Sequence, residues 1–404
     1  MPTRPRVLIA NVSSQIGLTM IRELARHGVE VHGLSDDPHG IGCYSRYLAS
    51  SVARERGKGL VGQVRAIATR LAPCVVMAIS EPDICLLNAH RSELAGVSLL
   101  IPDEAGMAVV LDKARTRELA QEVGIRVPRV WQVRLLAELA GTDVTFPVVL
   151  KWAQPLAVLP KLHEAGLPLD KFRYCYDRGE LNDYLRPFEA IGEFPLIAEY
   201  CPGYGLGLSF FMWRREALLS FQHRRIHEWP PEGGFSTLCQ GVPLTSHGEL
   251  REQSIALLRR IGWEGAAMVE YRHDPVTGQS WLMEINGRFW GSLPLASQSG
   301  AEFGWMTYAV MALKDESVRC QVRAGLRCRS LVTDTKWLLR IVFAQHKIQD
   351  RSLRFSRLRE SAAWVALFFD PRVRDFVFSL SDPVPAFVDL LAGAIRRIAR
   401  RTQS

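Results

Sequence analysis

The sequence predicts an α/β protein with three parts: a parallel α/β sheet, a middle α+β unit with antiparallel sheets, and a helical, basic C-terminal region. Apolar runs alternate with helical patterns from the N-terminus to about residue 102, a hairpin pattern follows at 266–287, and positive charge gathers after residue 310. We expect the parts to span residues 1–106, 107–310 and 311–404.

Composition excludes several classes of protein. The 404 residues are 48% hydrophobic and 23% charged, as in an ordinary globular protein. No apolar run reaches the roughly 18 residues of a membrane span, and the opening MPTRPRVLIANV continues into a strand pattern instead of a signal peptide. The eight cysteines form no C-x-x-C pair, which argues against a zinc site and a disulfide framework. We therefore expect a cytoplasmic protein.

The net charge of +8 is unevenly distributed. Residues 311–404 contain 18 Lys and Arg against 9 Asp and Glu, so their net charge is +9 and that of the first 310 residues is −1. A near-neutral main body needs no polyanionic partner, and the basic tail has little aromatic interleaving. We therefore expect no nucleic-acid binding.

The last helix pattern, PAFVDLLAGAIRRIARR, combines an apolar stripe with arginines Arg396, Arg397, Arg400 and Arg401. A basic amphipathic helix can lie on an anionic membrane surface, or it can dock on the protein's own core with its basic side in water. Docking is the favoured interpretation, and peripheral membrane contact is the alternative.

The first part predicts a Rossmann-like topology. Strands are expected at 5–10, 29–35, 74–80 and 97–102, with a first helix over 13–28. The turn after the first strand, ANVSSQIG, lacks the G-x-G-x-x-G pattern, so close approach of the backbone to a pyrophosphate is poorly supported. We expect a structural or substrate-side role for this part.

The middle unit presents two lysines before its hairpin. VVLDKARTRELAQEVG is predicted as a helix with Lys113 near its start, and the apolar strand FPVVLKWA (146–153) carries Lys151. FPLIAEYCPG (194–203) is a further strand that ends in Glu199 and a Pro-Gly turn. A lone lysine at a strand end is usually a surface residue. Two lysines ahead of a carboxylate pair favour contacts with phosphate oxygens.

The predicted hairpin AAMVEYRHDPVTGQSWLMEING places Glu270 on one strand and Glu284 on the other. Glu284, Asn286 and Arg288 recur at every second residue, so they project to one face of an extended chain. Carboxylate and amide oxygens suit Mg²⁺, which is usually held by one or two carboxylates together with phosphates. The alternative is a half-exposed hairpin with surface carboxylates, but both glutamates follow apolar runs.

This ordered set of motifs resembles the ATP-grasp superfamily over about residues 107–310. The motifs are Asp112–Lys113, the Lys151 strand, IAEYCPG, MVEY and EINGR. The resemblance implies a lid at about 112–198, a core at about 199–310, and a preceding α/β domain. It also implies a ligase that uses ATP and Mg²⁺, or Mn²⁺, to convert a substrate carboxylate to an acyl phosphate and condense it with an amine.

The resemblance implies a role for each matching residue. Lys113 and Lys151 would hold the phosphates of ATP, and Glu199 would contact the adenine beside the backbone of Tyr200 and Cys201. Glu270, Glu284 and Asn286 would bind Mg²⁺, and Arg288 would steady the phosphoryl group. The loop at 151–168 departs from the superfamily because it lacks a glycine-rich run, which leaves its phosphate contacts in doubt.

The segment SFQHRRIHEWPPEGGFSTLCQ is the candidate substrate site. Arg224 and Arg225 could clamp a carboxylate, and the Gly233–Gly234 turn with Ser236 could offer donors to the acyl phosphate. The alternative is a basic strand followed by a surface loop.

Amino acids, peptides or uronic-acid-like carboxylates are the expected substrates. A carboxylate–thiol ligase, an ATP-binding scaffold without turnover, and a homodimeric assembly stay open as alternatives.

Overall fold

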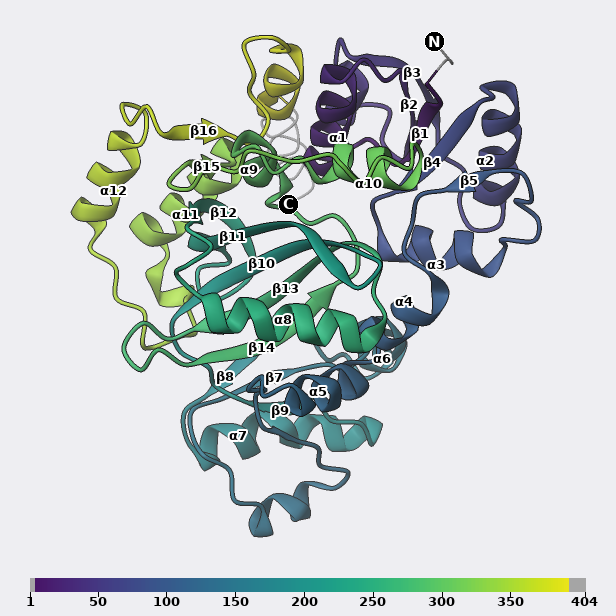
Figure 1. Cartoon of the computed structure of the whole chain (residues 1–404). Coiled ribbons are helices and arrows are strands. Elements are labelled where there is room, and N and C mark those ends of the chain that lie inside the picture. Colours follow the sequence, from purple (N-terminus) through teal and green to yellow (C-terminus); the bar gives the residue numbers. More distant parts are fainter. Residues whose placement is uncertain (1–3, 392–404) are drawn as a thin grey trace.

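The structure, a computed structural model, describes residues 4–391 (Figure 1). It contains a five-stranded sheet A, a four-stranded sheet B and a seven-stranded sheet C. Sheet C lies in the centre of the view, with sheet A at the upper right and sheet B below (Figure 1). Within the described residues, no helix has both the length and the apolar character needed to cross a membrane.

Sheet A is parallel, in the order β3 (Leu48–Ala53), β2 (Val31–Ser35), β1 (Arg6–Ala10), β4 (Cys74–Ala78) and β5 (Ser98–Leu99). Its helices are α1 (Gln15–Arg26), α2 (Gly59–Arg70) and α3 (Glu81–Ala89). The predicted parallel sheet is confirmed. The sequence analysis did not predict β3, because five of its six side chains are exposed and it therefore carries no buried pattern.

The helix predicted from VVLDKARTRELAQEVG is interrupted at Asp112. It forms α4 (Glu104–Leu111) and α5 (Lys113–Glu122). The Asp112 carboxylate accepts hydrogen bonds from the backbone amides of Ala114 and Arg115, at 2.9 and 3.0 Å. Such bonds satisfy amides that have no partner inside a helix, so they begin a new helix at this point.

Sheet B is antiparallel, in the order β6 (Val130–Trp131), β9 (Leu196–Glu199), β7 (Val148–Lys151) and β8 (Arg173–Cys175). It carries α6 (Pro155–Glu164), α7 (Arg178–Leu185) and 3₁₀ turns at Leu136–Gly141 and Arg186–Ile191. The predicted loop at 151–168 therefore contains a helix, because Val158 and Leu162 are buried at helical spacing. This unit has an apolar core of its own, separate from the other two.

Sheet C runs in the order β14 (Ser280–Asn286), β13 (Gly265–His273), β10 (Tyr204–Trp213), β11 (Glu216–Trp229), β12 (Phe235–Val242), β15 (Arg327–Arg329) and β16 (Val373–Asp375). Its pairs are antiparallel except β15 with β16. The predicted hairpin at 266–287 is confirmed as β13 and β14. Leu208 and Phe210 pack into the cluster that includes α8 (Gly248–Ile261), and Phe211 into the cluster with α9 (Leu293–Gln298) and α10 (Phe303–Met311).

The C-terminal region is only partly helical, which corrects the expectation. It contains α11 (Leu331–Phe343), a 3₁₀ turn at Gln345–Lys347 and α12 (Arg357–Ala366), but also β15 and β16. These two strands have three residues each, too short to show a strand pattern in the sequence. The arginines at 396, 397, 400 and 401 lie outside the described residues, so the predicted terminal helix stays a prediction.

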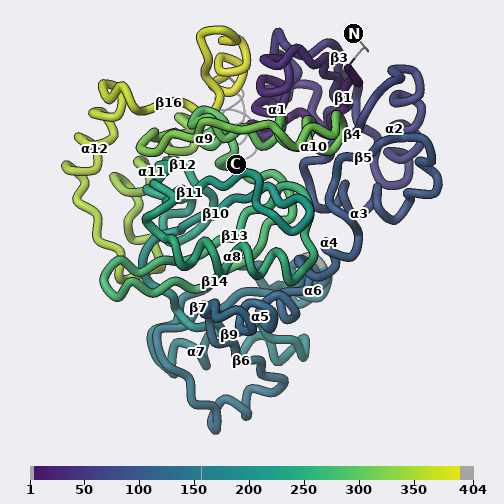
Figure 2. Tube along the Cα trace, viewed as in Figure 1, coloured from purple at the N-terminus to yellow at the C-terminus, as the bar shows by residue number. Residues whose placement is uncertain are grey.

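The C-terminal chain wraps along the other units (Figure 2). Its Asp350 accepts a hydrogen bond from Tyr200, at 3.0 Å, and its Arg351 pairs with Glu180 of α7 at 2.6 Å. Further on, Asp382 pairs with Arg22 of α1 at 3.0 Å. The region thus touches sheets A, B and C in turn and does not stand apart.

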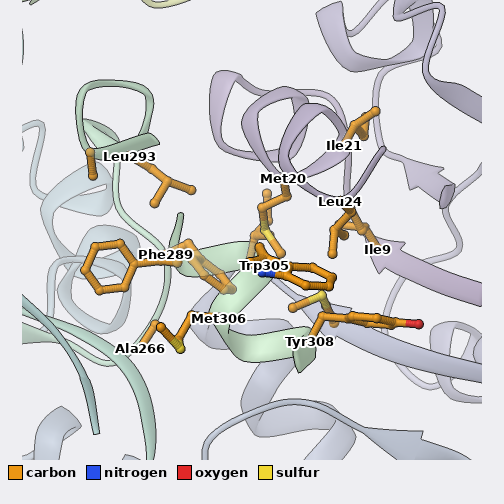
Figure 3. Packing of buried hydrophobic residues seen from close by; sticks show 14 of the residues in the cluster. Ile9, Met20, Ile21, Leu24, Ala266, Phe289, Leu293, Trp305, Met306 and Tyr308 are labelled. Carbon is orange, nitrogen blue, oxygen red and sulfur yellow. The ribbon is translucent and has the colours of Figure 1, made fainter. Parts of the chain in front are cut away.

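Sheet A is attached to sheet C through a continuous apolar cluster. Figure 3 shows Met20 and Leu24 of α1 beside Trp305 and Met306 of α10, with Phe289 closer to sheet C. Burial of such side chains contributes roughly 1.5–3 kcal/mol each. This contact therefore fixes the N-terminal unit against the central sheet, whereas sheet B packs around its own core.

Candidate active site

Two lysines and a glutamate from three different elements meet between sheets B and C. Lys151 ends β7, Lys113 begins α5 and Glu284 lies on β14. The pKa of Lys151 is lowered, first by burial and then by the charge of Lys113, while the charge of Glu284 acts in the opposite direction. The predicted pair of lysines and the predicted carboxylate are therefore electrostatic neighbours.

A third cation belongs to this group. Arg117, one turn beyond Lys113 on α5, also lowers the pKa of Lys151. Arg117 is not among the predicted site residues, although its spacing of four residues from Lys113 places both on one face of a helix. The amides at the N-terminus of α5 are already bonded to Asp112, so the three cationic side chains are the groups suited to an anion.

The acidic residues of the candidate site lie on the β13–β14 hairpin. Glu270 and Glu284 are paired directly across the two strands. Burial raises the pKa of Glu270, and the Glu284 charge raises it further, while Arg225 acts to lower it. Asn286 is buried, and its amide Nδ2 lies 3.5 Å from Glu284 Oε1. The structure thus brings together the three predicted metal ligands.

This set of oxygen donors fits Mg²⁺. Two carboxylates and one amide oxygen leave coordination positions for water and phosphate, as Mg²⁺ prefers. Among residues 4–391, no group of three or more His, Cys, Asp or Glu side chains is arranged to hold a metal alone. A cation here would also relieve the repulsion that raises the pKa of Glu270.

Arg225 is the centre of a buried ion-pair network. Its guanidinium contacts the Glu270 carboxylate, and its Nη1 lies 3.2 Å from Glu228 Oε1 and 2.8 Å from the Gly234 carbonyl oxygen. Arg272 joins the network through Glu228, at 3.0 Å. Burial lowers the pKa of Arg225, but Glu270 and Glu228 more than offset this, so the pKa is raised and Arg225 stays charged.

Two glycines on β10 make room for this network. A Cβ at Gly205 would lie 2.5 Å from Arg225 Cδ, and a Cβ at Gly207 would lie 2.3 Å from His223 Cε1. Residues two positions apart in a strand share one face of it. The G-x-G of YGLGLSF therefore leaves this face of β10 without side chains beneath Arg225. Neither glycine is among the predicted site residues. Their spacing of two residues in the sequence indicates that both lie on one face of a strand.

The structure does not bring Arg224 and Arg225 together. Arg224 is register-paired with Leu206, which packs into the cluster that includes α8, and its guanidinium bonds Gln240 Oε1 at 2.9 Å. Arg225 lies on the opposite face, over Gly205. The predicted two-arginine clamp is therefore wrong, because adjacent residues of a strand point to opposite faces.

The Gly-rich turn is tied to the network through its backbone. The Gly234 carbonyl accepts the bond from Arg225, and the Gly233 amide donates to the Pro230 carbonyl at 3.1 Å. Gly233 has a φ of 143°, and a Cβ at Gly234 would lie 2.1 Å from the Trp229 carbonyl oxygen. Ser236 is buried opposite Glu228. The Gly233 amide is thus already bonded within the turn. Hydrogen bonds from Gly234 and Ser236 to a substrate stay a prediction.

The segment IAEYCPG forms the hinge between sheets B and C. Glu199 Oε2 accepts a hydrogen bond from the Arg129 amide, next to β6, at 2.9 Å. Contact of the second carboxylate oxygen, Oε1, with adenine stays a prediction. The Tyr200 hydroxyl is hydrogen-bonded to Asp350. Contact of the Tyr200 backbone with adenine stays a prediction. Burial raises the pKa of Cys201 to about 12, so its thiol is no nucleophile near neutral pH.

Arg288 lies at the end of β14, where this strand meets the N-terminal unit. Its Nε is 3.3 Å from the carboxylate of Glu81, the first residue of α3, and its Nη1 donates to the Phe289 carbonyl at 3.0 Å. The side chain is about 29% exposed, so it keeps donors available to the solvent. Contact of Arg288 with a phosphoryl group stays a prediction.

One family model matches part of the chain in sequence. Residues 239–302 match the family model described as the carbamoyl-phosphate synthase L chain, ATP binding domain. No curated protein matches the chain in sequence.

Several solved structures share the architecture of this chain. L-amino acid ligase from Bacillus licheniformis is 16% identical with a TM-score of 0.57, covering 80% of this chain and 79% of its own. Phosphoribosylglycinamide synthetase from Anaerococcus prevotii is 14% identical with a TM-score of 0.57, covering 80% of both chains. Biotin carboxylase from Campylobacter jejuni is 13% identical with a TM-score of 0.57, covering 80% of this chain and 74% of its own. The chain therefore has the ATP-grasp fold, as its motifs predict.

Proposed function

We propose that this chain is an ATP- and Mg²⁺-dependent ligase that activates a carboxylate as an acyl phosphate and joins it to an amine. The main support is that Lys151 has Lys113 and Glu284 as charged neighbours, and that Glu284 is paired with Glu270 across β13 and β14. The cations suit a polyphosphate, and the carboxylates suit its metal ion. L-amino acid ligase and phosphoribosylglycinamide synthetase share the fold.

Each group of residues has a distinct task in this proposal. Lys113, Lys151 and Arg117 bind phosphate oxygens, and Glu270, Glu284 and Asn286 hold Mg²⁺, which neutralises charge on the phosphates when bound. Arg225 positions Glu270, because its Nη1 and Nη2 groups are bonded to Glu228, the Gly234 carbonyl and Glu270 within the protein. Arg288 faces the reacting phosphoryl group, and positioning of this kind supplies most of the catalysis in phosphoryl transfer.

The reaction has two steps. A carboxylate oxygen of the substrate attacks the γ-phosphorus, and the bond to the oxygen that leaves with ADP breaks. The amine nitrogen then attacks the acyl carbon, inorganic phosphate leaves, and the nitrogen loses a proton to form the amide. With a thiol in place of the amine, the same site would yield a thioester.

One observation favours a second candidate, an ATP-binding protein without turnover. The segment after Lys151 forms α6 and contains no glycine-rich run. A lid of this kind offers few backbone amides to cover the phosphates. This candidate predicts nucleotide binding without ADP release under any substrate.

Two further features belong to the proposal. All eight cysteines are free, which supports a reducing, cytoplasmic location. A homodimer and the use of Mn²⁺ stay predictions.

ADP release tests the proposed reaction. We would supply Mg²⁺·ATP with a crossed panel of amino acids and of peptide or uronic-acid carboxylates, and analyse each positive mixture by mass spectrometry. Release that requires two co-substrates, with a product mass equal to their condensation, is the expected result. Clear nucleotide binding with no release across the panel would favour the second candidate.

A further inference from the structure

A cavity of about 600 Å³ lies on the face of sheet C opposite the candidate active site. The lining includes Arg224 and Tyr204, which belong to the α8 face of the sheet, and also Arg225, whose guanidinium contacts Glu270 and Glu228 on the other face. The volume lies within the range of roughly 300–1,000 Å³ that is typical of small-molecule sites. Apart from Arg225, none of its lining residues has a role in the proposed ligase chemistry.

Helix α12 forms one wall of this cavity. Arg359, Ala363 and Ala366 line it at a spacing of i, i+4 and i+7, so one face of the helix is turned toward the space. No residue of α12 is buried. Because the alanine side chains are short, the helix spans the gap to β11 without filling it. A well-packed interior would leave no such volume.

The charged groups around the cavity favour an anion. Within residues 4–391, the Arg359 side chain makes no hydrogen bond or ion pair, and Arg224 bonds only the neutral Gln240. Arg327 is 3.7 Å from Asp370, whose carboxylate also pairs with Arg372 at 3.2 Å. Glu360 is the other acid in the lining. Two guanidinium groups thus face the space without a carboxylate partner.

The apolar part of the lining comes mainly from Ile226, Leu238 and Leu367, and Arg225 and His227 complete it. We propose that this cavity binds a dissolved small anion with an apolar body, such as an alkyl or aryl carboxylate, with Arg224 and Arg359 as its anion contacts. A guanidinium pairs well with a carboxylate, and the apolar wall would bury the rest of the ligand. This inference stands whether or not the ligase proposal holds.

Titration with the fluorescent anion 8-anilino-1-naphthalenesulfonate tests the site through two matched pairs of variants. Arg359→Glu should weaken binding of the probe about tenfold, whereas Arg357→Glu, the same change on another face of α12, should leave it unchanged. Ala363→Trp should fill the cavity and abolish the saturable binding. Ala362→Trp, which adds the same indole outside the cavity, should not.

Displacement tests the class of ligand. Decanoate, below the concentration at which it forms micelles, should displace the probe from the wild-type protein, and uncharged decanol should do so far less. Circular dichroism should show that all four variants keep the fold, since α12 has no buried residue. Equal binding within either pair of variants, or equal displacement by decanol, would overturn the proposal. If Ala363→Trp unfolds the protein, the Arg359 and Arg357 pair decides.

Discussion

The guanidinium of Arg225 on β11 reaches over the backbone of Gly205 on β10 to contact the Glu270 carboxylate on β13. The side chain thus crosses one whole strand of sheet C. It can do so only because β10 presents glycine at the crossing. Glu270, a predicted metal ligand, is therefore held by Arg225 from two strands away. The G-x-G pattern of β10 leaves the space through which Arg225 passes.

Gly205→Ala should destabilise the protein and displace Arg225. The new Cβ would lie 2.5 Å from Arg225 Cδ and 2.7 Å from Glu228 Oε1, and neither atom can move freely in a buried network. We expect a loss of about 1–3 kcal/mol in the free energy of unfolding, measured with urea. Gly248→Ala is the control, since a Cβ there meets nothing within 4 Å and should raise stability by about 0.4–1 kcal/mol. Equal effects of the two substitutions would contradict the crossing.

Arg225→Ala and Arg224→Ala should differ sharply although the residues are adjacent. Loss of Arg225 leaves the buried Glu270 carboxylate without its cationic partner and Glu228 with Arg272 alone, which costs about 3–5 kcal/mol of stability. Loss of the exposed Arg224 removes one contact with Gln240 and should change stability by less than about 0.5 kcal/mol. Thermal and urea unfolding of both variants measures the difference. Similar losses would place both side chains in one environment, against the structure.

Glu284→Ala should abolish nucleotide turnover and leave the fold intact. The side chain is exposed, so the free energy of unfolding should change by less than about 0.5 kcal/mol. A metal ligand would be lost, however, and the Lys151 ammonium would lose its neighbouring negative charge. The activity assay is ADP release with Mg²⁺ as the only divalent ion. Full activity of this variant would show that Glu284 is not a metal ligand.

Glu23 on α1 should make stability depend on pH. Burial raises its pKa from 4.5 to about 7, and the charge of Glu302 adds to this, although Ser297 and Arg26 act to lower it. Between these two pKa values the folded state binds more protons than the unfolded state, so stability falls as pH rises through the window and levels off above it. Over this pH window the free energy of unfolding should fall by up to about 3 kcal/mol.

Glu23→Gln should remove this dependence while keeping the bonds that Glu23 accepts from the amides of Gly304 and Trp305. The free energy of unfolding at pH 5 and pH 8, for the wild type and the variant, measures the effect. The same decrease in both proteins would assign the pH dependence to other groups.

The sequence predicts those features that follow from local period and order. Glu284 and Asn286 are separated by a single residue on an apolar strand, and Lys113 directly follows an N-capping aspartate. In the structure, Lys113 begins α5 after Asp112, and Glu284 and Asn286 lie on β14. The strand β3 and the two short C-terminal strands escaped prediction because exposed or three-residue strands carry no apolar alternation.

Features that depend on contacts between distant segments were harder to predict. The pairing of Arg225 with Glu270 requires knowledge that β10 lies between β11 and β13, which no local pattern reveals. The two-arginine clamp failed for a simpler reason, because the alternation of side chains along a strand already separates Arg224 from Arg225. The cavity beside α12 arises from short alanine side chains on a helix that packs loosely.

The most direct test of the candidate active site is calorimetric titration with a non-hydrolysable ATP analogue, with and without Mg²⁺. We expect Mg²⁺-dependent binding to the wild type. Lys151→Ala should bind at least about tenfold more weakly, because a bond to a charged phosphate contributes about 1.5–3 kcal/mol. Lys171→Ala, at an exposed lysine of the same lid, should bind like the wild type. Binding that is absent from the wild type, or unaffected by loss of Lys151, would contradict a nucleotide site between sheets B and C.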